Sequence, residues 1–165
     1  NMNRFLVLIF SMFILPALTL SDFVQASSLT DLKLFDVGSF EKIVKEKDQQ
    51  DHLVILWSFD CPPCIKELQK VSALNQQYPG YQLTLINTDG LEEQARVRTL
   101  LKKYNLLKLD NWIFSNTDEE KLRYDIDARW FGDLPRSYFF SMQGEIKRLK
   151  GALTSPELLE LFSPL

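Results

Sequence analysis

A short apolar run that leads directly into two cysteines constrains the fold of this chain more than any other feature. Residues 53–59, Leu-Val-Ile-Leu-Trp-Ser-Phe, are nearly all apolar, and such a run is typical of a strand buried on both faces of a sheet. A Cys-Pro-Pro-Cys segment occupies positions 61–64, and apolar side chains then recur at helical spacing over residues 63–77. The sequence therefore predicts a central strand followed at once by a helix that begins at the two cysteines.

The rest of the chain alternates between short apolar segments and amphipathic ones. No repeat or low-complexity linker interrupts residues 27–165, which we expect to form one domain. Strands that alternate with helices favour an α/β fold, with a central mixed sheet flanked by helices on both faces and a C-terminal antiparallel hairpin and helix. We expect further strands over 29–35, 81–87, 112–114, 137–142 and 145–149, helices over 40–47, 91–104 and 155–162, and a helical turn over 119–124.

The N-terminal segment differs in kind from the remainder. Residues 5–20 are predominantly apolar, follow Arg4, and give way to a polar stretch that contains Val-Gln-Ala at 24–26. This pattern predicts a secretory signal peptide over residues 1–26, cleaved after Ala26, because the apolar part is shorter than the ~20 residues that span a bilayer. An uncleaved N-terminal anchor over residues 5–20 is the alternative. Either implies a periplasmic or other extracytoplasmic location.

Composition narrows the chemistry of the two cysteines. The net charge is −3 and no dense cluster of Lys and Arg occurs, so we expect no nucleic-acid partner. A disulfide between residues three apart constrains an unfolded chain very little, so the pair is better explained by reactivity than by stability. Structural zinc needs four ligands, and the sequence offers two cysteines and one histidine. We therefore predict no metal and no cofactor, and interpret His52 as a loop residue without a role.

The Cys-Pro-Pro-Cys segment itself predicts thiol chemistry. A helix N-terminus carries roughly half a positive charge, which favours Cys61 as a thiolate and nucleophile. Cys64, one turn further, should be more buried and act as the resolving thiol. Pro62 and Pro63 lack backbone N–H groups, and Asp60 adds a negative charge, so both effects oppose the thiolate and favour a reducing couple. We expect a disulfide reductase; an oxidase or isomerase, and a Cu(I)-carrying module using the same thiols, remain alternatives.

Residues 53–68 resemble the active-site stretch of the thioredoxin superfamily, and within it the exported TlpA/ResA-like thiol–disulfide oxidoreductases. Trp57 matches the strand tryptophan of that family, and Lys66-Glu67 matches its usual basic–acidic pair. The likeness extends through residues 86–89 and Leu134-Pro135 to the closing hairpin and helix. It implies a thioredoxin-like three-layer fold, a cis Pro135 that faces the active site, and a Leu134 backbone that pairs with an extended substrate segment.

The resemblance also implies partners. These are exported proteins that contain cysteines, with apocytochrome c as one candidate in cytochrome c maturation, and a membrane or periplasmic thiol as the electron donor. The expected site therefore comprises the catalytic pair Cys61 and Cys64, supported by Trp57, Asp60, Pro62, Pro63, Glu67, Leu134 and Pro135.

Three positions depart from the family pattern. Asp60 stands where an aromatic or small residue is common, and Ile55 stands where ordinary thioredoxins have a buried aspartate. Proton transfer near Cys64 would then depend on Glu67, Asp89 or Glu93, although Glu67 is equally consistent with a solvated helix residue. Arg136 follows the proline, where a small polar residue is usual; we expect it to be solvated, and contact with an acidic partner is the alternative.

Overall fold

The structure is a computed structural model that describes residues 32–163. The signal peptide or anchor predicted over residues 1–26 lies outside the described residues. Between residues 32 and 163 there is no helix with the length and apolar content needed to cross a membrane.

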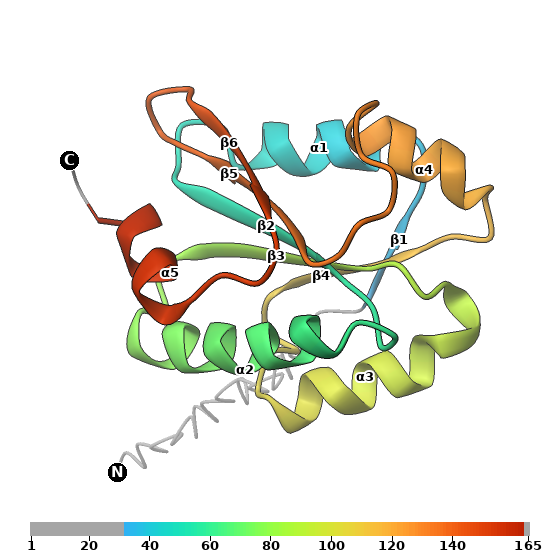
Figure 1. Ribbon diagram of the computed structural model, residues 1–165, viewed down its shortest axis with the longest axis horizontal. Helices are drawn as coiled ribbons and strands as arrows, with labels where there is room; N and C mark the ends of the chain where they lie inside the picture. Colours follow the sequence, from blue (N-terminus) through green and yellow to red (C-terminus); the bar gives the residue numbers. More distant parts are fainter. Residues whose placement is uncertain (1–31, 164–165) are drawn as a thin grey trace, which may run out of the picture.

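Six strands form one mixed sheet within the described residues, in the order β1-β4-β3-β2-β5-β6 (Figure 1). β1, β4, β3 and β2 run parallel to one another, whereas β5 runs antiparallel to both β2 and β6. The predicted C-terminal hairpin is therefore confirmed. The strands are β1 (Lys33–Phe35), β2 (His52–Trp57), β3 (Gln82–Asn87), β4 (Asp110–Phe114), β5 (Arg136–Phe140) and β6 (Ile146–Lys150).

Helices cover both faces of this sheet and produce three layers. One face carries the helices α1 (Ser39–Glu46) and α4 (Glu119–Ile126), and the other carries α2 (Pro62–Gln77) and α3 (Gln94–Lys103) (Figure 1). A short 3₁₀ turn, η1 (Leu91–Glu93), leads into α3, and the last helix, α5 (Ser155–Leu161), packs beside α2. The predicted α/β fold with three layers is confirmed.

The composition of β2 follows from this arrangement. Leu53, Ile55 and Trp57 point into the core shared with α2, α3 and α5, whereas Val54 and Leu56 point into the core under α1 and α4. A strand covered on both faces has no position for an exposed side chain, which is why the run is apolar throughout. Both cysteines belong to the core on the α2 side.

Two details of the sequence-based prediction were wrong. His52 is not a loop residue: it begins β2 and is fully buried. The strand predicted over 53–59 ends at Trp57, so Ser58–Asp60 form a short connection to the cysteines. At the last helix, Thr154 is the N-cap, and its hydroxyl accepts the N–H of Glu157 in a capping box.

Candidate functional site: a disulfide at the start of helix α2

The two cysteines lie where β2 passes into α2. Cys61 is the N-cap residue of α2 and Cys64 lies in its first turn. Their sulfur atoms form a disulfide of 1.97 Å with a Cα–Cα distance of 5.2 Å. Cys61 is 7% exposed and Cys64 is fully buried. The prediction that Cys64 is the deeper of the two is therefore confirmed.

Few donors contact the more accessible sulfur. The backbone N–H of Cys64 donates to Sγ of Cys61 over 3.2 Å, and among residues 32–163 no other hydrogen bond to that sulfur is found. Pro62 and Pro63 are exposed in the first turn and contribute no N–H. Asp60 is also exposed, directly before Cys61. The positive end of α2 therefore contributes one backbone N–H, that of Cys64, to the Cys61 sulfur, while the residue before Cys61 carries a negative charge.

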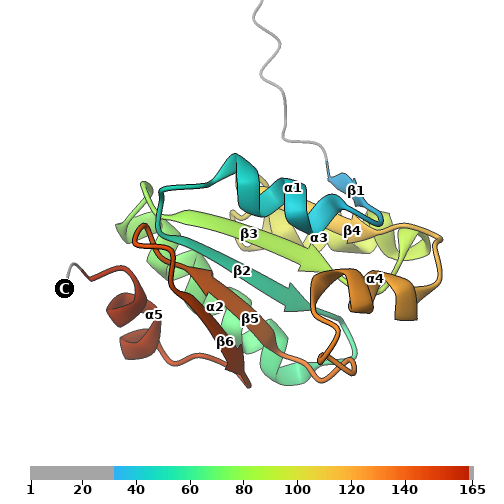
Figure 2. The same cartoon turned by 90° about the horizontal axis from the view of Figure 1, so that it is seen from above.

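The segment before β5 lies at the same edge of the sheet. β5 runs antiparallel to β2 and its Arg136 pairs with Leu56, so the start of β5 lies beside the end of β2 (Figure 2). The Leu134–Pro135 peptide bond is cis, as expected. Pro135 is buried and its carbonyl accepts the N–H of Gly151 over 3.0 Å. Leu134 is half-buried and lies beyond the last paired residues of the β2–β5 ladder.

Glu67 lies one helical turn after Cys64 and is fully buried. Its Oε1 accepts the N–H of Leu153 over 2.8 Å, whereas its Oε2 has no hydrogen-bond partner in the described part of the chain. Burial raises the pKa of Glu67 to about 7, against the opposing effects of the Leu153 N–H and of Lys70. The alternative of a solvated helix residue is therefore wrong.

The other two carboxylates considered for proton transfer lie elsewhere. Glu93 is paired on the surface with Arg96, with 3.4 Å between the charged atoms. Asp89 binds the connection between β2 and the cysteines, through the hydroxyl of Ser58 and the N–H of Phe59. Ser58 was not among the predicted site residues. The signal that could have indicated it is a polar residue in an otherwise apolar strand-to-cysteine stretch.

Arg136 is buried, so its expected solvation is wrong. It is 3% exposed, and its guanidinium contacts the Asp127 carboxylate at 3.4 Å and the Tyr138 hydroxyl at 3.2 Å. The reason is position: β5 lies between β2 and β6 in a sheet that helices cover on both faces. A charge placed there needs a partner, and Asp127, just after α4, supplies it.

His52 also has a specific buried partner, at the opposite end of β2 from the cysteines. Its Nε2 lies 2.9 Å from the Thr84 hydroxyl. Burial lowers its pKa to about 4, with Lys47 adding to the effect and Asp110 opposing it. His52 is therefore a neutral core residue and lies outside the site.

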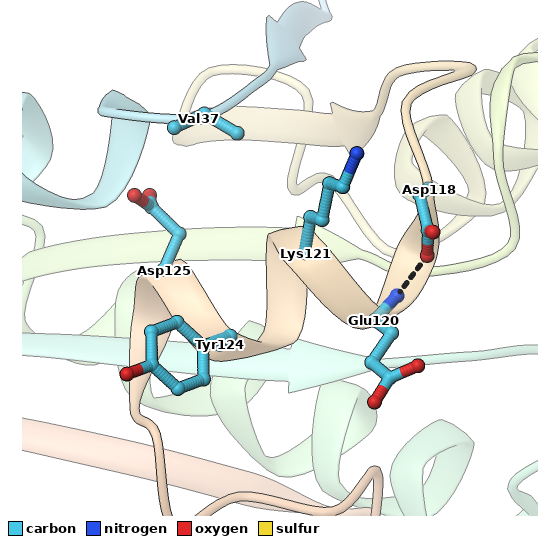
Figure 3. A pocket seen from close by; sticks show the side chains of 6 residues that line it. All are labelled: Val37, Asp118, Glu120, Lys121, Tyr124 and Asp125. Carbon is cyan, nitrogen blue, oxygen red and sulfur yellow. Dashed lines mark hydrogen bonds between the residues drawn. The ribbon is translucent and has the colours of Figure 1, made fainter.

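A hollow of the described surface lies apart from the disulfide. It has a volume of about 490 Å³ and opens over α4 and the β1–α1 connection (Figure 3). Neither cysteine lines it. Its lining residues are Val37, Asp118, Glu120, Lys121, Tyr124 and Asp125.

Comparison with known proteins gives structural relatives alone. No protein-family model matches the sequence, and no curated protein matches it significantly. The fold is similar to a secreted Mycobacterium tuberculosis disulfide oxidoreductase homologous to E. coli DsbE, at a TM-score of 0.57 and 18% identity over 71% of this chain and 83% of that one. It is also similar to StoA from Bacillus subtilis, at a TM-score of 0.53 and 24% identity over 70% of this chain and 84% of that one.

A third similar structure is a secreted thiol-disulfide isomerase from Corynebacterium glutamicum, at a TM-score of 0.54 and 16% identity over 72% of this chain and 71% of that one. Similarity at these identities establishes the architecture, and the sequence adds the Cys-x-x-Cys pair. The chain thus has the thioredoxin-like fold of these thiol–disulfide oxidoreductases and carries its own Cys61–Cys64 disulfide at the start of α2.

Proposed function

We propose that this protein is an extracytoplasmic thiol–disulfide oxidoreductase that reduces disulfides in other exported proteins. The observation that carries the proposal is the Cys61–Cys64 disulfide, with one sulfur at the helix N-terminus near the surface and the other fully buried one turn later. That asymmetry separates an attacking sulfur from a resolving one. The secreted character of two of the similar proteins, together with the predicted leader, supports the location.

The reaction proceeds in two exchanges once the pair is reduced. The Cys61 thiolate attacks one sulfur of a substrate disulfide; a Cys61–substrate bond forms, and the other substrate sulfur leaves as a thiolate that is protonated by water. Cys64 then loses its proton and attacks Sγ of Cys61, and the second substrate sulfur leaves. The substrate is reduced and the Cys61–Cys64 disulfide is formed again. A thiol donor, membrane-bound or periplasmic, must supply two electrons for each further cycle.

Glu67 is the group best placed to take the proton of Cys64. It follows Cys64 by one turn on the buried side of α2, and a carboxyl group whose pKa is about 7 can both accept and release a proton near neutral pH. The free Oε2 leaves one oxygen available for this exchange. Trp57, fully buried beneath the site and packed edge-on against Phe59 at 5.3 Å, supports the loop from below.

The protein should pass electrons to its substrate, because the site stabilises the Cys61 thiolate only weakly. Pro62 and Pro63 withhold two N–H donors, and Asp60 opposes a second negative charge nearby. A less stabilised thiolate makes the disulfide relatively more stable and the couple more reducing. The substrate would lie across Leu134 and Pro135, where the backbone of Leu134 continues past the end of the β2–β5 ladder and can pair with an extended segment.

A mixed-disulfide trap tests the proposal. In a Cys64→Ser variant of the full chain, Cys61 still attacks but no thiol resolves the intermediate, so exported proteins should accumulate in covalent complexes that a reductant releases. Cys61→Ser is the matched control and should trap far fewer. Equal trapping by both variants, or none with tight Cu(I) binding by the wild type, would contradict the proposal and favour the metal-carrying alternative.

A further inference from the structure

The short connection between β2 and the cysteines is held by a single carboxylate from the next strand. Asp89 lies just beyond the end of β3, which pairs in parallel with β2. Its Oδ1 accepts the hydroxyl of Ser58 over 2.5 Å, and its Oδ2 accepts the backbone N–H of Phe59 over 2.9 Å. The side-chain amide of Asn87 donates to the same Oδ2 over 2.7 Å and thereby orients the carboxylate.

The backbone N–H groups of residues 59–61 all donate to acceptors within this connection or to Asp89. The Phe59 N–H is bound by Asp89, and the Asp60 N–H donates to the Ser58 hydroxyl over 3.0 Å. The N–H of Cys61 donates to the Ser58 carbonyl over 3.4 Å. The Ser58 hydroxyl thus links the Asp89 carboxylate to the N–H of Asp60, two residues further along the chain. None of the three N–H groups donates to Sγ of Cys61.

Both oxygens of Asp89 are therefore engaged as acceptors. A carboxylate whose two oxygens both accept hydrogen bonds is poorly suited to take a proton from Cys64. The sequence-based role of Asp89 in proton transfer is therefore not favoured. Its negative charge, however, is fixed against Phe59, two residues before the nucleophile. The negative charge of Asp89 disfavours a thiolate at Cys61, and its hydrogen bond with the Phe59 N–H prevents that N–H from stabilising the thiolate. Both effects therefore act against the Cys61 thiolate.

We infer that Asp89 is a positioning residue that holds the Ser58–Asp60 connection so that the N–H groups of Phe59 and Asp60 stay away from the Cys61 sulfur, and thereby keeps the Cys61–Cys64 couple reducing. This inference rests on the proposed function and extends it, because it names what sets the redox balance of the pair outside the Cys-Pro-Pro-Cys segment. Releasing the hold should free donors for the thiolate, stabilise the reduced form and make the protein a weaker reductant.

Other charges near the loop act alongside Asp89. The Arg96 guanidinium lies 3.9 Å from the centroid of the Phe59 ring and is paired with Glu93. Asp60 precedes Cys61, and Glu67 lies on the buried side of α2. A test must therefore separate the hydrogen bonds of Asp89 from its charge and from the general field of these groups.

The experiment compares three variants with the wild-type protein in glutathione redox buffers at pH 7. Asp89→Asn removes the charge and part of the hold; Ser58→Ala removes the Ser58 hydroxyl but leaves every charge in place. Glu92→Gln is the control, because Glu92 is an exposed acid in the adjacent turn. The fraction of reduced Cys61–Cys64 at each buffer ratio gives the equilibrium constant, and the pH dependence of alkylation of the reduced protein gives the pKa of Cys61.

We expect Asp89→Asn to favour the reduced form at least threefold, which corresponds to a potential higher by about 14 mV at 29.6 mV per tenfold. Ser58→Ala should shift the equilibrium in the same direction by less, the pKa of Cys61 should fall in both, and Glu92→Gln should match the wild type. Unchanged equilibria in both Asp89→Asn and Ser58→Ala would overturn the inference even if both unfold more easily, and so would an equal effect of Glu92→Gln. A wild-type protein that does not equilibrate with glutathione at all would instead contradict the proposed function.

Discussion

Replacing Glu67 with glutamine should change how the stability of the oxidised protein depends on pH. Glu67 is fully buried and burial raises its pKa from the ordinary 4.5 to about 7. In the unfolded chain the group returns to its ordinary pKa. Between these two values the folded protein therefore binds more protons than the unfolded one, and stability falls as the pH rises.

The magnitude follows from the same pair of values. One pKa unit corresponds to ~1.36 kcal/mol, so the rise from 4.5 to about 7 amounts to about 3 kcal/mol of lost stability. The loss begins near pH 4.5 and is complete somewhat above pH 7. Glutamine keeps the shape of the protonated acid but does not ionise, so Glu67→Gln should become more stable than the wild type by about this amount above pH 7.

The assay is urea unfolding of both proteins, with the disulfide intact, at intervals from pH 4.5 to pH 8.5. The informative quantity is the difference in unfolding free energy between variant and wild type, since other groups titrate equally in both. Glu160→Gln, which changes an exposed glutamate of α5, should show no such pH-dependent gain. A difference that stays constant across this range would refute the reasoning, because it would mean that Glu67 ionises alike in the folded and unfolded chain.

Two further predictions concern buried polar groups away from the disulfide. The lowered pKa of His52 makes the wild type lose stability as the pH falls from 6.5 towards 4. The unfolding free energy of His52→Gln, which can still bond the Thr84 hydroxyl, should therefore rise relative to the wild type by up to about 3 kcal/mol over this range; a pH-independent difference in urea unfolding would contradict this. Arg136→Met removes the buried one of three arginines that contact Asp127; because Arg148 and Arg129 still contact that carboxylate, the loss should be about 1.5–3 kcal/mol. Arg129→Ala, which removes an exposed partner of the same carboxylate, should cost under about 0.5 kcal/mol; equal losses in thermal unfolding would show that burial of the arginine does not matter.

The sequence was sufficient where local pattern decides the structure. The apolar run became β2 because each of its faces meets a core, and the depth of Cys64 follows from its place in the first turn of α2. Glu67 could also have been placed: Cys64, Glu67, Leu68 and Val71 recur at spacings of three and four, which puts Glu67 on the buried side of the helix.

The sequence was insufficient where a polar residue depends on a distant partner. His52 and Arg136 are residue types that usually lie at the surface. Their burial is possible because strand pairing places Thr84 beside His52 and the end of α4 places Asp127 beside Arg136. The role of Asp89 likewise depends on the register in which Asn87 pairs with Trp57. The local sequence does not predict that register. The contacts between Asp89 and residues 58–59 therefore form only when the sheet is assembled.

The most direct test of the proposed function is the standard redox potential of the Cys61–Cys64 pair in the purified protein. It is obtained by quantifying free thiols after equilibration in defined thiol–disulfide buffers. We expect one reversible two-electron transition involving Cys61 and Cys64, with a potential more negative than about −180 mV. A pair that never exchanges with the buffer, or a potential close to the ~−120 mV of strong oxidants, would contradict it.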